Sequence, residues 1–352
     1  MQYRKMGRTG LKVSTYCMGV MNLGSQVSEK DSLEIIGTAI EQGVNFFDAA
    51  DMYVSGKAEE ILGKAIKGKR DSVVVATKIG HWLKMKDNVR VEAADIAGKP
   101  TPYSAWEGGG EAGPNDMGLS RKHIMQGVEA SLRRLDTDYI DLYYCHMPDF
   151  DTPLEETLRA LDDLVHQGKV RYIGCSNYLA WRLCKALGVS TLHNLERFEC
   201  VQPPYNLLAR DIEYELMPLC ASEGVGMCVY SPMAAGFLSG KYDKAKGAIE
   251  GARFALGHLG LRYNQQYWAD SNFEAVDKLK QVASSHGRKM AQFALAWVLQ
   301  HSAITSVVSG ASSLSQLEQN LEATELKLSE EELTACDEVW SVLRPFRFFY
   351  GR

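Results

Sequence analysis

The chain has 352 residues, and its 39 basic and 44 acidic side chains leave a net charge of −5 at pH 7. So mild a charge argues against a polyanion-binding surface, and nucleic acid is not an expected partner. The N-terminus lacks the apolar core of a signal peptide and no apolar run has membrane-spanning length, which predicts a soluble, cytoplasmic protein without a membrane partner. The eight cysteines form no CxxC pair and no zinc spacing, so we expect reduced thiols and no metal site.

Short strands and helices alternate along most of the chain. Residues 2–14 have the pattern of a β-hairpin with a glycine-bearing turn at 7–10. Expected strands then lie at 14–21, 46–48, 73–77, 140–145, 171–175, 199–202, 226–230 and 304–308. Expected helices lie at 29–42, 58–67, 121–135, 154–167, 179–188, 211–223, 286–300 and 314–322. This alternation predicts an α/β fold, a (β/α)8 TIM barrel in one domain over residues 1–352, with the hairpin plugging one end.

Two long segments interrupt the alternation. Residues 81–119 are rich in glycine and have little apolar periodicity, and residues 234–272 combine six glycines with a cluster of aromatic side chains. Loops of this length in a compact domain are usually lids or binding loops. We therefore expect both segments to be long βα loops over the C-terminal mouth of the barrel, with a disordered insertion as the alternative for 81–119.

Four chemically active side chains stand at or just beyond the ends of three expected strands. Asp48 ends the strand at 46–48, and Tyr53 follows it by five residues. Lys78 follows the strand at 73–77, and His146 follows the strand at 140–145. The carboxyl ends of the strands in a parallel barrel converge on one mouth, where such barrels carry out their chemistry. The four side chains are therefore predicted to meet there.

These four residues, in their order and spacing, resemble the catalytic tetrad of the aldo-keto reductase superfamily. The flanking sequences are similar to the family's as well, at 43–48, 76–78, 133–142, 168–177 and 309–313. The resemblance extends over about residues 2–340, nearly the whole chain. It implies a barrel enzyme that reduces aldehydes and ketones to alcohols, reversibly, with a nicotinamide cofactor.

The resemblance assigns a role to each member of the tetrad. Tyr53 would be the general acid, Asp48 would hold Lys78, and His146 would donate a hydrogen bond to the substrate carbonyl. Independently of the family, a free tyrosine with a pKa of about 10 is a poor acid at neutral pH. We expect the Lys78 ammonium to lower the pKa of Tyr53 by favouring the phenolate.

No Gly-x-Gly-x-x-Gly motif is present, so a Rossmann fold is excluded. The resemblance implies instead that NADPH lies across the barrel mouth. Its nicotinamide would contact Ser176, Asn177, Gln202 and Tyr230. Its pyrophosphate would lie under the loop that begins at Ser231, with cations from Lys241 and Arg253. Its adenosine end would meet Gly310, Ser312, Gln316, Gln319 and Asn320. The remaining predicted cofactor contacts are Gly19, Val20, Met21, Pro232, Met233, Ala235 and Gly236.

Two positions depart from the family pattern at the adenosine end. Gln319 stands where a glutamate is usual, and Gln316 stands where many members have an arginine. An amide cannot grip a 2′-phosphate bidentately as a guanidinium does. NADPH is the predicted cofactor, and NADH is the open alternative.

Substrate recognition is expected to come from the loops. The candidate pocket residues are Met52, Trp82, Met147, Tyr263 and Trp268, with Met21 and Tyr267 beside them, and they favour an apolar or ring-bearing carbonyl compound. The alternative for 263–268 is that these aromatic residues pack a lid helix. The sequence leaves open whether the protein forms a homo-oligomer.

Two other functions stay open at this stage. The Pro148-Asp149 pair after the histidine resembles a bacterial and fungal branch with aryl-alcohol dehydrogenases, which is similar to the potassium-channel β subunits. The first alternative is therefore a regulatory subunit that senses nicotinamide redox state on a membrane protein. Channel subunits of this kind carry asparagine where this chain has His146, which favours turnover. The second alternative is a barrel isomerase or dehydratase that uses the same four residues.

Overall fold

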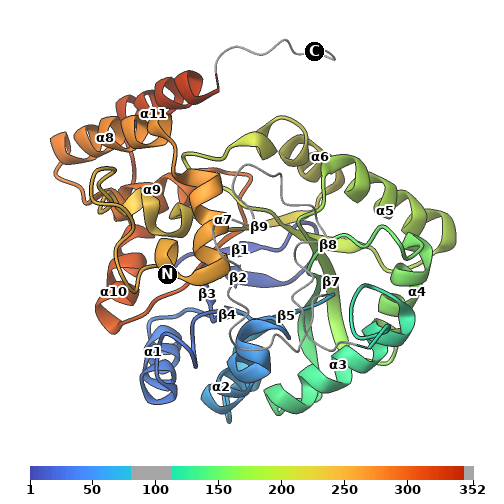
Figure 1. Ribbon diagram of the computed structural model, residues 1–352. Coiled ribbons are helices and arrows are strands. Elements are labelled where there is room, and N and C mark those ends of the chain that lie inside the picture. The colour runs from blue at the N-terminus through green and yellow to red at the C-terminus, as the bar shows by residue number, and fades with distance from the viewer. Residues whose placement is uncertain (81–112, 345–352) are drawn as a thin grey trace.

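Eight parallel strands form a closed barrel in the computed structural model, which describes residues 1–80 and 113–344 apart from the side chains of residues 258 and 259. The strands follow one another around the barrel in chain order, and the last pairs with the first. They are β3 (Tyr16–Gly19), β4 (Phe46–Asp48), β5 (Val74–Ile79), β6 (Ile140–Cys145), β7 (Val170–Ser176), β8 (Phe198–Gln202), β9 (Gly226–Tyr230) and β10 (Ser306–Ser309). The predicted TIM barrel is confirmed (Figure 1).

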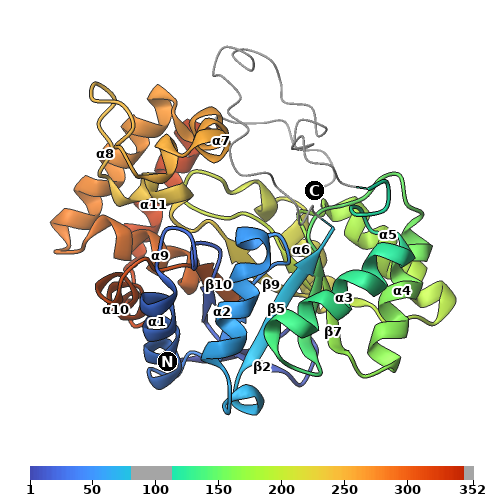
Figure 2. The ribbon, with the colours of Figure 1, turned by 60° about the horizontal axis from the view of Figure 1, so that its bottom comes forward.

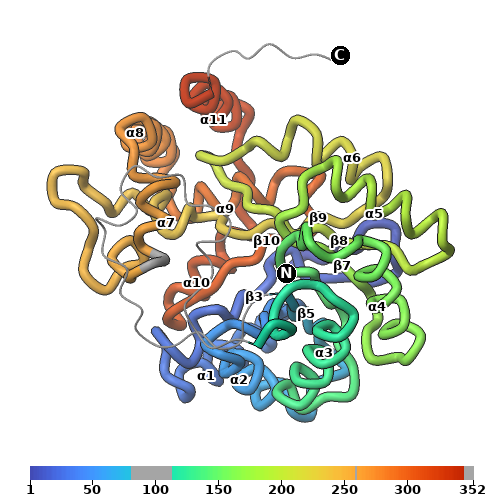
Figure 3. The backbone as a smooth tube through the Cα atoms, turned by 45° about the vertical axis from the view of Figure 1, so that its right-hand side comes forward, coloured from blue at the N-terminus to red at the C-terminus, as the bar shows by residue number. Residues whose placement is uncertain are grey.

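A ring of helices surrounds the strands and buries their outer faces (Figure 1). Its helices are α1 (Glu29–Glu41), α2 (Lys57–Ala65), α3 (Arg121–Leu135), α4 (Leu154–His166), α5 (Ala180–His193), α6 (Leu216–Glu223), α9 (Met290–Gln300) and α10 (Leu314–Ala323). In the tube view α10 lies beside α1, and this contact closes the ring (Figure 3). Of the helices in the described ranges, none combines the length and the apolarity needed to cross a bilayer.

The predicted N-terminal hairpin is also confirmed. It pairs β1 (Tyr3–Lys5) with β2 (Lys12–Ser14), and Figure 2 shows β2 at the opposite end of the molecule from α7 (Gly257–Tyr267). Met6 and Val13 are fully buried in the same apolar cluster as Cys17 and Phe46 of the barrel strands. The hairpin therefore seals the end of the barrel at which the strands begin and leaves the other end as the mouth.

The expected long loop at 234–272 is largely helical rather than irregular, and its helix α7 agrees with the alternative of a helix at 263–268. It contains the 3-10 turns η6 (Ala234–Ser239) and η7 (Arg253–Ala255), then α7 and the beginning of α8 (Asp270–Ser285). Phe237, Tyr242, Phe254 and Trp268 of this segment form an aromatic cluster with Phe273, which follows it in α8. Packing between these aromatic side chains holds the segment together. The contacts join residues at irregular spacings along the chain, so the sequence shows no helical periodicity that would have predicted them.

Some element boundaries were also predicted wrongly. The expected helix at 211–223 is a 3-10 turn, η5 (Asp211–Glu213), followed by α6, and the expected helix at 286–300 begins only at Met290. Besides α7, two helices were not predicted. They are α8, which ends before Gly287 at a φ of 68°, and α11 (Glu330–Leu343), which begins with a capping box between Ser329 and Glu332. The expected loop at 81–119 lies mainly outside the described residues, which resume at residue 113.

Candidate active site

Lys78 lies at the centre of the mouth and uses all three of its ammonium protons. It is on β5, its side chain is fully buried, and its Nζ forms an ion pair with Asp48 from the end of β4. The same Nζ donates to the carbonyl of Ala49 at 2.8 Å and to the Tyr53 hydroxyl at 3.3 Å. Burial alone would lower the pKa of Lys78, but the attraction of Asp48 and Tyr53 outweighs it and raises the pKa. Lys78 is therefore held as a cation.

The second oxygen of Asp48 also has a partner. Gln202, at the end of β8, donates from its amide nitrogen to Asp48 Oδ2 at 2.8 Å. Both side chains are buried. Asp48 is therefore tied on one side to the cation and on the other to a strand across the barrel, which fixes the orientation of the ion pair.

Tyr53 is presented by a strained turn. It begins the 3-10 turn η1 (Tyr53–Gly56), in which Val54, Ser55 and Gly56 have φ angles of 50°, 53° and 90°. A left-handed conformation is unusual for a β-branched residue such as valine, and strain of this kind collects at functional sites. The turn folds the tyrosine back over β5, with Lys78 Nζ 5.0 Å from the centre of its ring.

The expected lowering of the Tyr53 pKa is corrected by the structure. Burial at the base of the mouth raises the pKa of the hydroxyl, and this effect is larger than the opposing attraction of Lys78 for the phenolate. The nearby charge of Asp48 adds to the increase. Without a ligand, Tyr53 therefore keeps its proton at neutral pH, as a proton donor must.

His146 follows β6 and faces Tyr53. The two rings are 5.8 Å apart and almost perpendicular. The backbone of His146 is fixed on both sides, because its amide donates to the carbonyl of Ile79 at 2.8 Å and its carbonyl accepts from the Asn177 side chain at 2.9 Å. The structure thus brings all four residues of the predicted tetrad to one mouth.

The residues predicted for the nicotinamide lie at the ends of β7, β8 and β9. Ser176 donates to the carbonyl of Gln202 at 2.7 Å, and the Tyr230 hydroxyl donates to the side-chain oxygen of Asn177 at 2.8 Å. Asn177 has a φ of 62°, which turns its side chain back across the strand ends. The Tyr230 ring is half-buried and is held in place through its hydroxyl. Burial raises the pKa of this tyrosine, so it is neutral.

The segment after β9 is a turn that contains several left-handed residues. Ser231, Ala234, Ala235 and Gly236 have positive φ angles of 61°, 47°, 57° and 94°. The amides of Ala234 and Gly236 donate within the turn, to the carbonyls of Ser231 at 3.0 Å and Met233 at 2.8 Å, so a phosphate contact here stays a prediction. The ammonium of Lys241 lies over the turn, since a Cβ added at Gly236 would be 3.9 Å from Lys241 Nζ. The other predicted contacts here, Pro232 and Met233, belong to the same turn, and Arg253 lies in η7.

The residues predicted for the adenosine end gather at the beginning of α10. The Gln316 side-chain oxygen accepts from both the amide and the hydroxyl of Ser312, at 2.7 and 2.9 Å. The Asn320 amide nitrogen is 3.3 Å from the carbonyl of Gly310. Gln319 turns along its own helix and donates to Ser315 at 3.2 Å.

The three predicted cofactor contacts at the end of β3 lie beside this group. A Cβ at Gly19 would be 3.8 Å from the amide of Gly310. The amide of Val20 donates to the carbonyl of Asp48 at 3.0 Å, which connects this end of the site to the tetrad. Met21 is half-buried.

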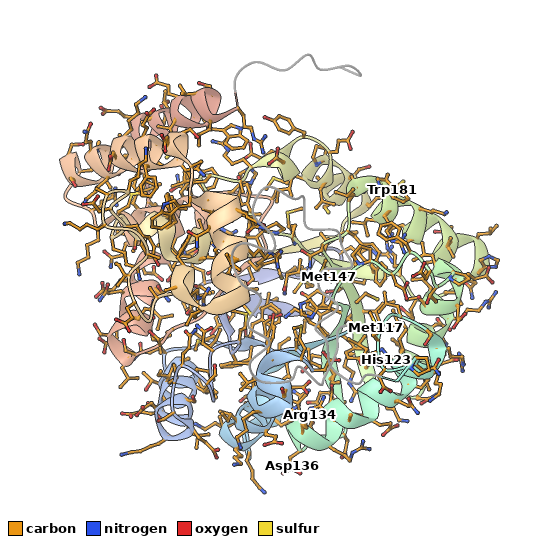
Figure 4. All side chains as sticks on the ribbon, viewed as in Figure 1. Met117, His123, Arg134, Asp136, Met147 and Trp181 are labelled. Atoms are coloured by element: carbon orange, nitrogen blue, oxygen red, sulfur yellow. The ribbon has the colours of Figure 1, made fainter. Side chains whose placement is uncertain are left out.

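The residues predicted for the substrate pocket do not all lie in the same part of the structure. Met147, which follows His146, is half-buried and lies nearer the centre of the barrel in Figure 4 than Trp181 does. Met52 and Tyr263 are half-buried. Trp268 packs in the aromatic cluster of 234–272, with its ring 5.1 Å from that of Phe273, so its contact with substrate stays a prediction. Trp82 lies outside the described residues.

A group of buried polar residues behind the tetrad was not predicted from the sequence. Asp51 and Glu59 are both fully buried, and both lie within twelve residues of Asp48. Glu59 stands on the apolar face of α2, beside Ala58, Ile61 and Leu62. An acid on an apolar helix face is the signal that could have revealed this group.

Comparison with known proteins gives consistent results over the length of the chain. The family model described as "Aldo/keto reductase family" matches residues 16–341. A protein of Arabidopsis thaliana named "Probable voltage-gated potassium channel subunit beta" is 38% identical over 93% of this chain and 92% of its own length. The "Versiconal hemiacetal acetate reductase" of Aspergillus parasiticus is 33% identical, with 96% of both chains covered. The "Uncharacterized oxidoreductase YrpG" of Bacillus subtilis is 34% identical, with 97% of this chain and 96% of its own covered. Together with the barrel, these matches show that the chain belongs to the aldo/keto reductase family.

Proposed function

We propose that this protein is an NADPH-dependent oxidoreductase that reduces aldehydes and ketones to alcohols, reversibly, with Tyr53 as the general acid. One observation carries the proposal: a single buried ammonium, Lys78, is shared between a carboxylate and a tyrosine hydroxyl at the mouth of the barrel. Membership of a family with relatives named as reductase and oxidoreductase supports it.

The residues at the mouth are suited to bind the cofactor. The half-buried Tyr230 ring offers a flat surface, and Ser176, Asn177 and Gln202 surround it with amide and hydroxyl groups. The positive-φ turn at 234–236, with Lys241 over it, suits a pyrophosphate. When bound, the reduced nicotinamide would supply a hydride to the carbonyl carbon.

The chain's own residues would manage the proton. His146 would donate a hydrogen bond to the carbonyl oxygen and so orient it. Tyr53 would give its proton to the same oxygen as negative charge develops there. Lys78 would stabilise the resulting phenolate, because its Nζ is already within hydrogen-bonding distance of the Tyr53 oxygen. Asp48 would keep Lys78 in position throughout.

NADPH is the proposed cofactor over NADH on family grounds, although the adenosine end lacks a strong phosphate clamp. Ser312 and Gln316 offer neutral hydrogen bonds where a guanidinium would give a charged, bidentate contact. Selectivity for the 2′-phosphate is therefore expected to be modest. For the substrate we propose an apolar or ring-bearing carbonyl compound, in keeping with Met52 and Met147 beside the tetrad, and the cytoplasmic location stays a prediction.

Titration of the purified protein with NADPH and with NADH, followed by fluorescence, tests the cofactor. A panel of aromatic aldehydes and ketones, followed at the nicotinamide absorbance, then tests turnover. We expect the protein to bind NADPH, and we expect the bound NADPH to be oxidised when substrate is added. An absence of cofactor binding would refute the proposal.

A second function is favoured by the names of two plant relatives, each 38% identical and named as a potassium-channel β subunit. On this basis the chain would be a cofactor-binding subunit that reports the nicotinamide redox state to a membrane protein. The presence of His146 facing Tyr53 favours turnover instead. Tight NADPH binding with no turnover across the whole panel would favour the regulatory function.

A further inference from the structure

A buried bridge of polar side chains lies between the barrel strands and the helices, directly behind the tetrad. At its centre is Glu59 of α2, which is fully buried. One oxygen of Glu59 accepts from the Thr77 hydroxyl at 2.6 Å, and the other accepts from Nε of Arg134 at 2.6 Å. The bridge therefore joins three elements, β5, α2 and α3.

Each of the two partners of Glu59 contacts or adjoins an element that carries a tetrad residue. Thr77 immediately precedes Lys78 on β5. Successive side chains of a strand point to opposite sides, so Thr77 points out toward the helices and Lys78 points into the barrel. A hydrogen bond that holds Thr77 in place therefore also holds the strand backbone that carries Lys78. Arg134 packs against Gly56, the last residue of the strained turn that begins with Tyr53. A Cβ at Gly56 would be 2.7 Å from Arg134 Cδ and 2.9 Å from its Nε. Figure 4 shows Arg134 where α3 faces α2.

Burying these charged side chains between the strands and the helices lowers the stability of the fold. An apolar side chain at position 59 would match its neighbours Ala58, Ile61 and Leu62, whereas a buried ion pair must offset the loss of hydration of both charges. Directional hydrogen bonds give what apolar packing does not, a fixed distance between the strand and the turn. The Tyr53 turn has three consecutive left-handed residues and so needs such external support.

We propose that Glu59 is a positioning residue: through Thr77 and Arg134 it sets the separation of Lys78 and Tyr53, which is 3.3 Å between Nζ and the hydroxyl oxygen. The inference rests on the proposed function for its effect on rate. Glu59 touches neither of the reacting groups and acts only through the two elements that carry them.

The chain contains a matched control for this bridge. Glu332 of α11 is also fully buried, and it accepts from Nε of Arg288 at 2.5 Å. The two arginine side chains are almost equally covered, with 18% of Arg134 and 20% of Arg288 exposed. The Arg288–Glu332 pair joins α11 to the residues before α9, away from β4 and β5. Glu332 also accepts from the backbone amide of Ser329 at 2.7 Å, in the capping box of α11. Glu332→Gln therefore removes the same buried charge from an arginine pair, and under the proposal only Glu59→Gln disturbs the mouth.

The test measures kcat, KM and cofactor affinity for both variants in the full-length protein. We expect Glu59→Gln to lower kcat roughly 10- to 100-fold, the loss associated with a misplacement of about 1 Å, with KM and NADPH affinity changed less than about threefold. Glu332→Gln should lose stability but keep the wild-type kcat at a temperature where it is folded. An unchanged kcat in folded Glu59→Gln would overturn the proposal.

A second measurement does not need turnover. In protein labelled with ¹³C at the tyrosine Cζ, the signal of Tyr53 can be assigned by its loss in Tyr53→Phe. We expect this signal to move or broaden in Glu59→Gln and to stay unchanged in Glu332→Gln. If it moves as expected while the wild type reduces nothing, positioning holds and the proposed reductase activity fails. If the wild type turns over and the signal does not move, the reductase holds and positioning fails.

Thr77→Val replaces Glu59→Gln if the latter does not fold. It removes one hydrogen bond of the bridge, keeps the branched shape and leaves every charge in place. We expect a smaller decrease in kcat, of a few-fold, and a shift of the Tyr53 signal in the same direction as in any folded Glu59 variant. A wild-type kcat and an unmoved Tyr53 signal in Thr77→Val would overturn the proposal.

Discussion

The two ends of the barrel hold their backbones differently. Within residues 1–80 and 113–344, positive φ angles at the hairpin end occur only at glycine, or at asparagine and aspartate, which adopt this conformation with little cost. These positions are Gly7, Gly43, Gly68, Asp136, Gly168, Asn194 and Gly224. At the mouth, positive φ angles also occur at Val54, Ser55, Asn177, Ser231, Ala234 and Ala235. The mouth therefore stores strain where the proposed chemistry takes place, and the hairpin end is built for stability.

Charge follows the same division. The mouth holds the buried Asp48–Lys78 pair and, behind it, the buried acids Asp51 and Glu59. The interior of the hairpin end is filled by apolar and sulfur-containing side chains, among them Met6 and Val13. The ion pair Arg8–Glu199 at this end lies nearer the surface, with 56% of the Arg8 side chain exposed. If this contrast is functional, changes at the mouth should alter rate more than stability, and changes at the hairpin end should do the reverse.

The largest effect on rate is expected from Tyr53→Phe. Loss of the proton donor should lower kcat roughly 10²- to 10⁴-fold, the usual contribution of a general acid. The affinity for NADPH should change little, because the hydroxyl is proposed to act on the substrate. The control is Tyr172→Phe, which removes the same atom from a tyrosine that packs in the cluster beneath the hairpin. A comparable loss of rate in both variants, or a loss of cofactor affinity equal to the loss of rate, would contradict the role of Tyr53.

The converse change is Met6→Ala at the hairpin end. Met6 is fully buried, with its sulfur 3.9 Å from that of Cys228, so truncation leaves a cavity in the closed end of the barrel. We expect a loss of about 2–5 kcal/mol in the free energy of unfolding, measured with urea. The kcat of the folded variant should equal that of the wild type. A large decrease in kcat without loss of stability would abolish the distinction between the two ends.

Asp51→Asn tests the buried charge at the mouth. Neither carboxyl oxygen of Asp51 has a hydrogen-bond partner among the described residues. Burial, and then repulsion by Glu59, raise the pKa of Asp51 well above its usual range, while Arg134 and Lys78 oppose the increase. The folded protein therefore retains a proton that the unfolded chain releases above about pH 4, and the stability associated with Asp51 is lost as the pH rises toward its folded pKa.

The expected result is that Asp51→Asn gains stability relative to the wild type as the pH rises. The gain should be at most about 1.4 kcal/mol for each pH unit, from about pH 4 upward, in urea unfolding at a series of pH values. Asp138→Asn, at an exposed aspartate, is the control and should show no such trend. If the difference between Asp51→Asn and the wild type is the same at every pH, Asp51 is ionised in the folded protein.

A smaller effect is expected from Lys241→Ala, which tests the phosphate side of the mouth. Removing the ammonium that lies over Gly236 should weaken NADPH binding about tenfold, the usual worth of one charged hydrogen bond. Lys280→Ala is a suitable control, since Lys280 is exposed and packs near Gly240, one residue before Lys241. Equal dissociation constants for the two variants, by fluorescence titration, would mean that the phosphate clamp lies elsewhere.

The sequence was sufficient to predict the barrel and the meeting of the tetrad. Strand ends in a parallel barrel converge by topology, so Asp48, Lys78 and His146 could be brought together without knowledge of any side-chain contact. Three-dimensional information was needed for properties that depend on surroundings. The pKa of Tyr53 was predicted with the wrong sign because a nearby cation is visible in the sequence and the depth of burial is not. The bridge through Glu59 was missed because its partners, Thr77 and Arg134, are far apart along the chain.

The smallest effect, and the most direct test of stored strain, is expected from Val54→Gly. Left-handed backbone costs an ordinary L-residue roughly 1–2 kcal/mol, and glycine avoids that cost but loses about 0.5–1 kcal/mol through the entropy of the unfolded chain. Since Val54 is only half-buried, little packing is lost, and the free energy of unfolding should change by less than about 1 kcal/mol. If the strain serves to hold Tyr53 over Lys78, the relaxed turn should lower kcat a few-fold with stability unchanged. A loss of stability with an unchanged kcat would instead mean that Val54 matters for its packing and that the strain at the mouth has no part in positioning Tyr53.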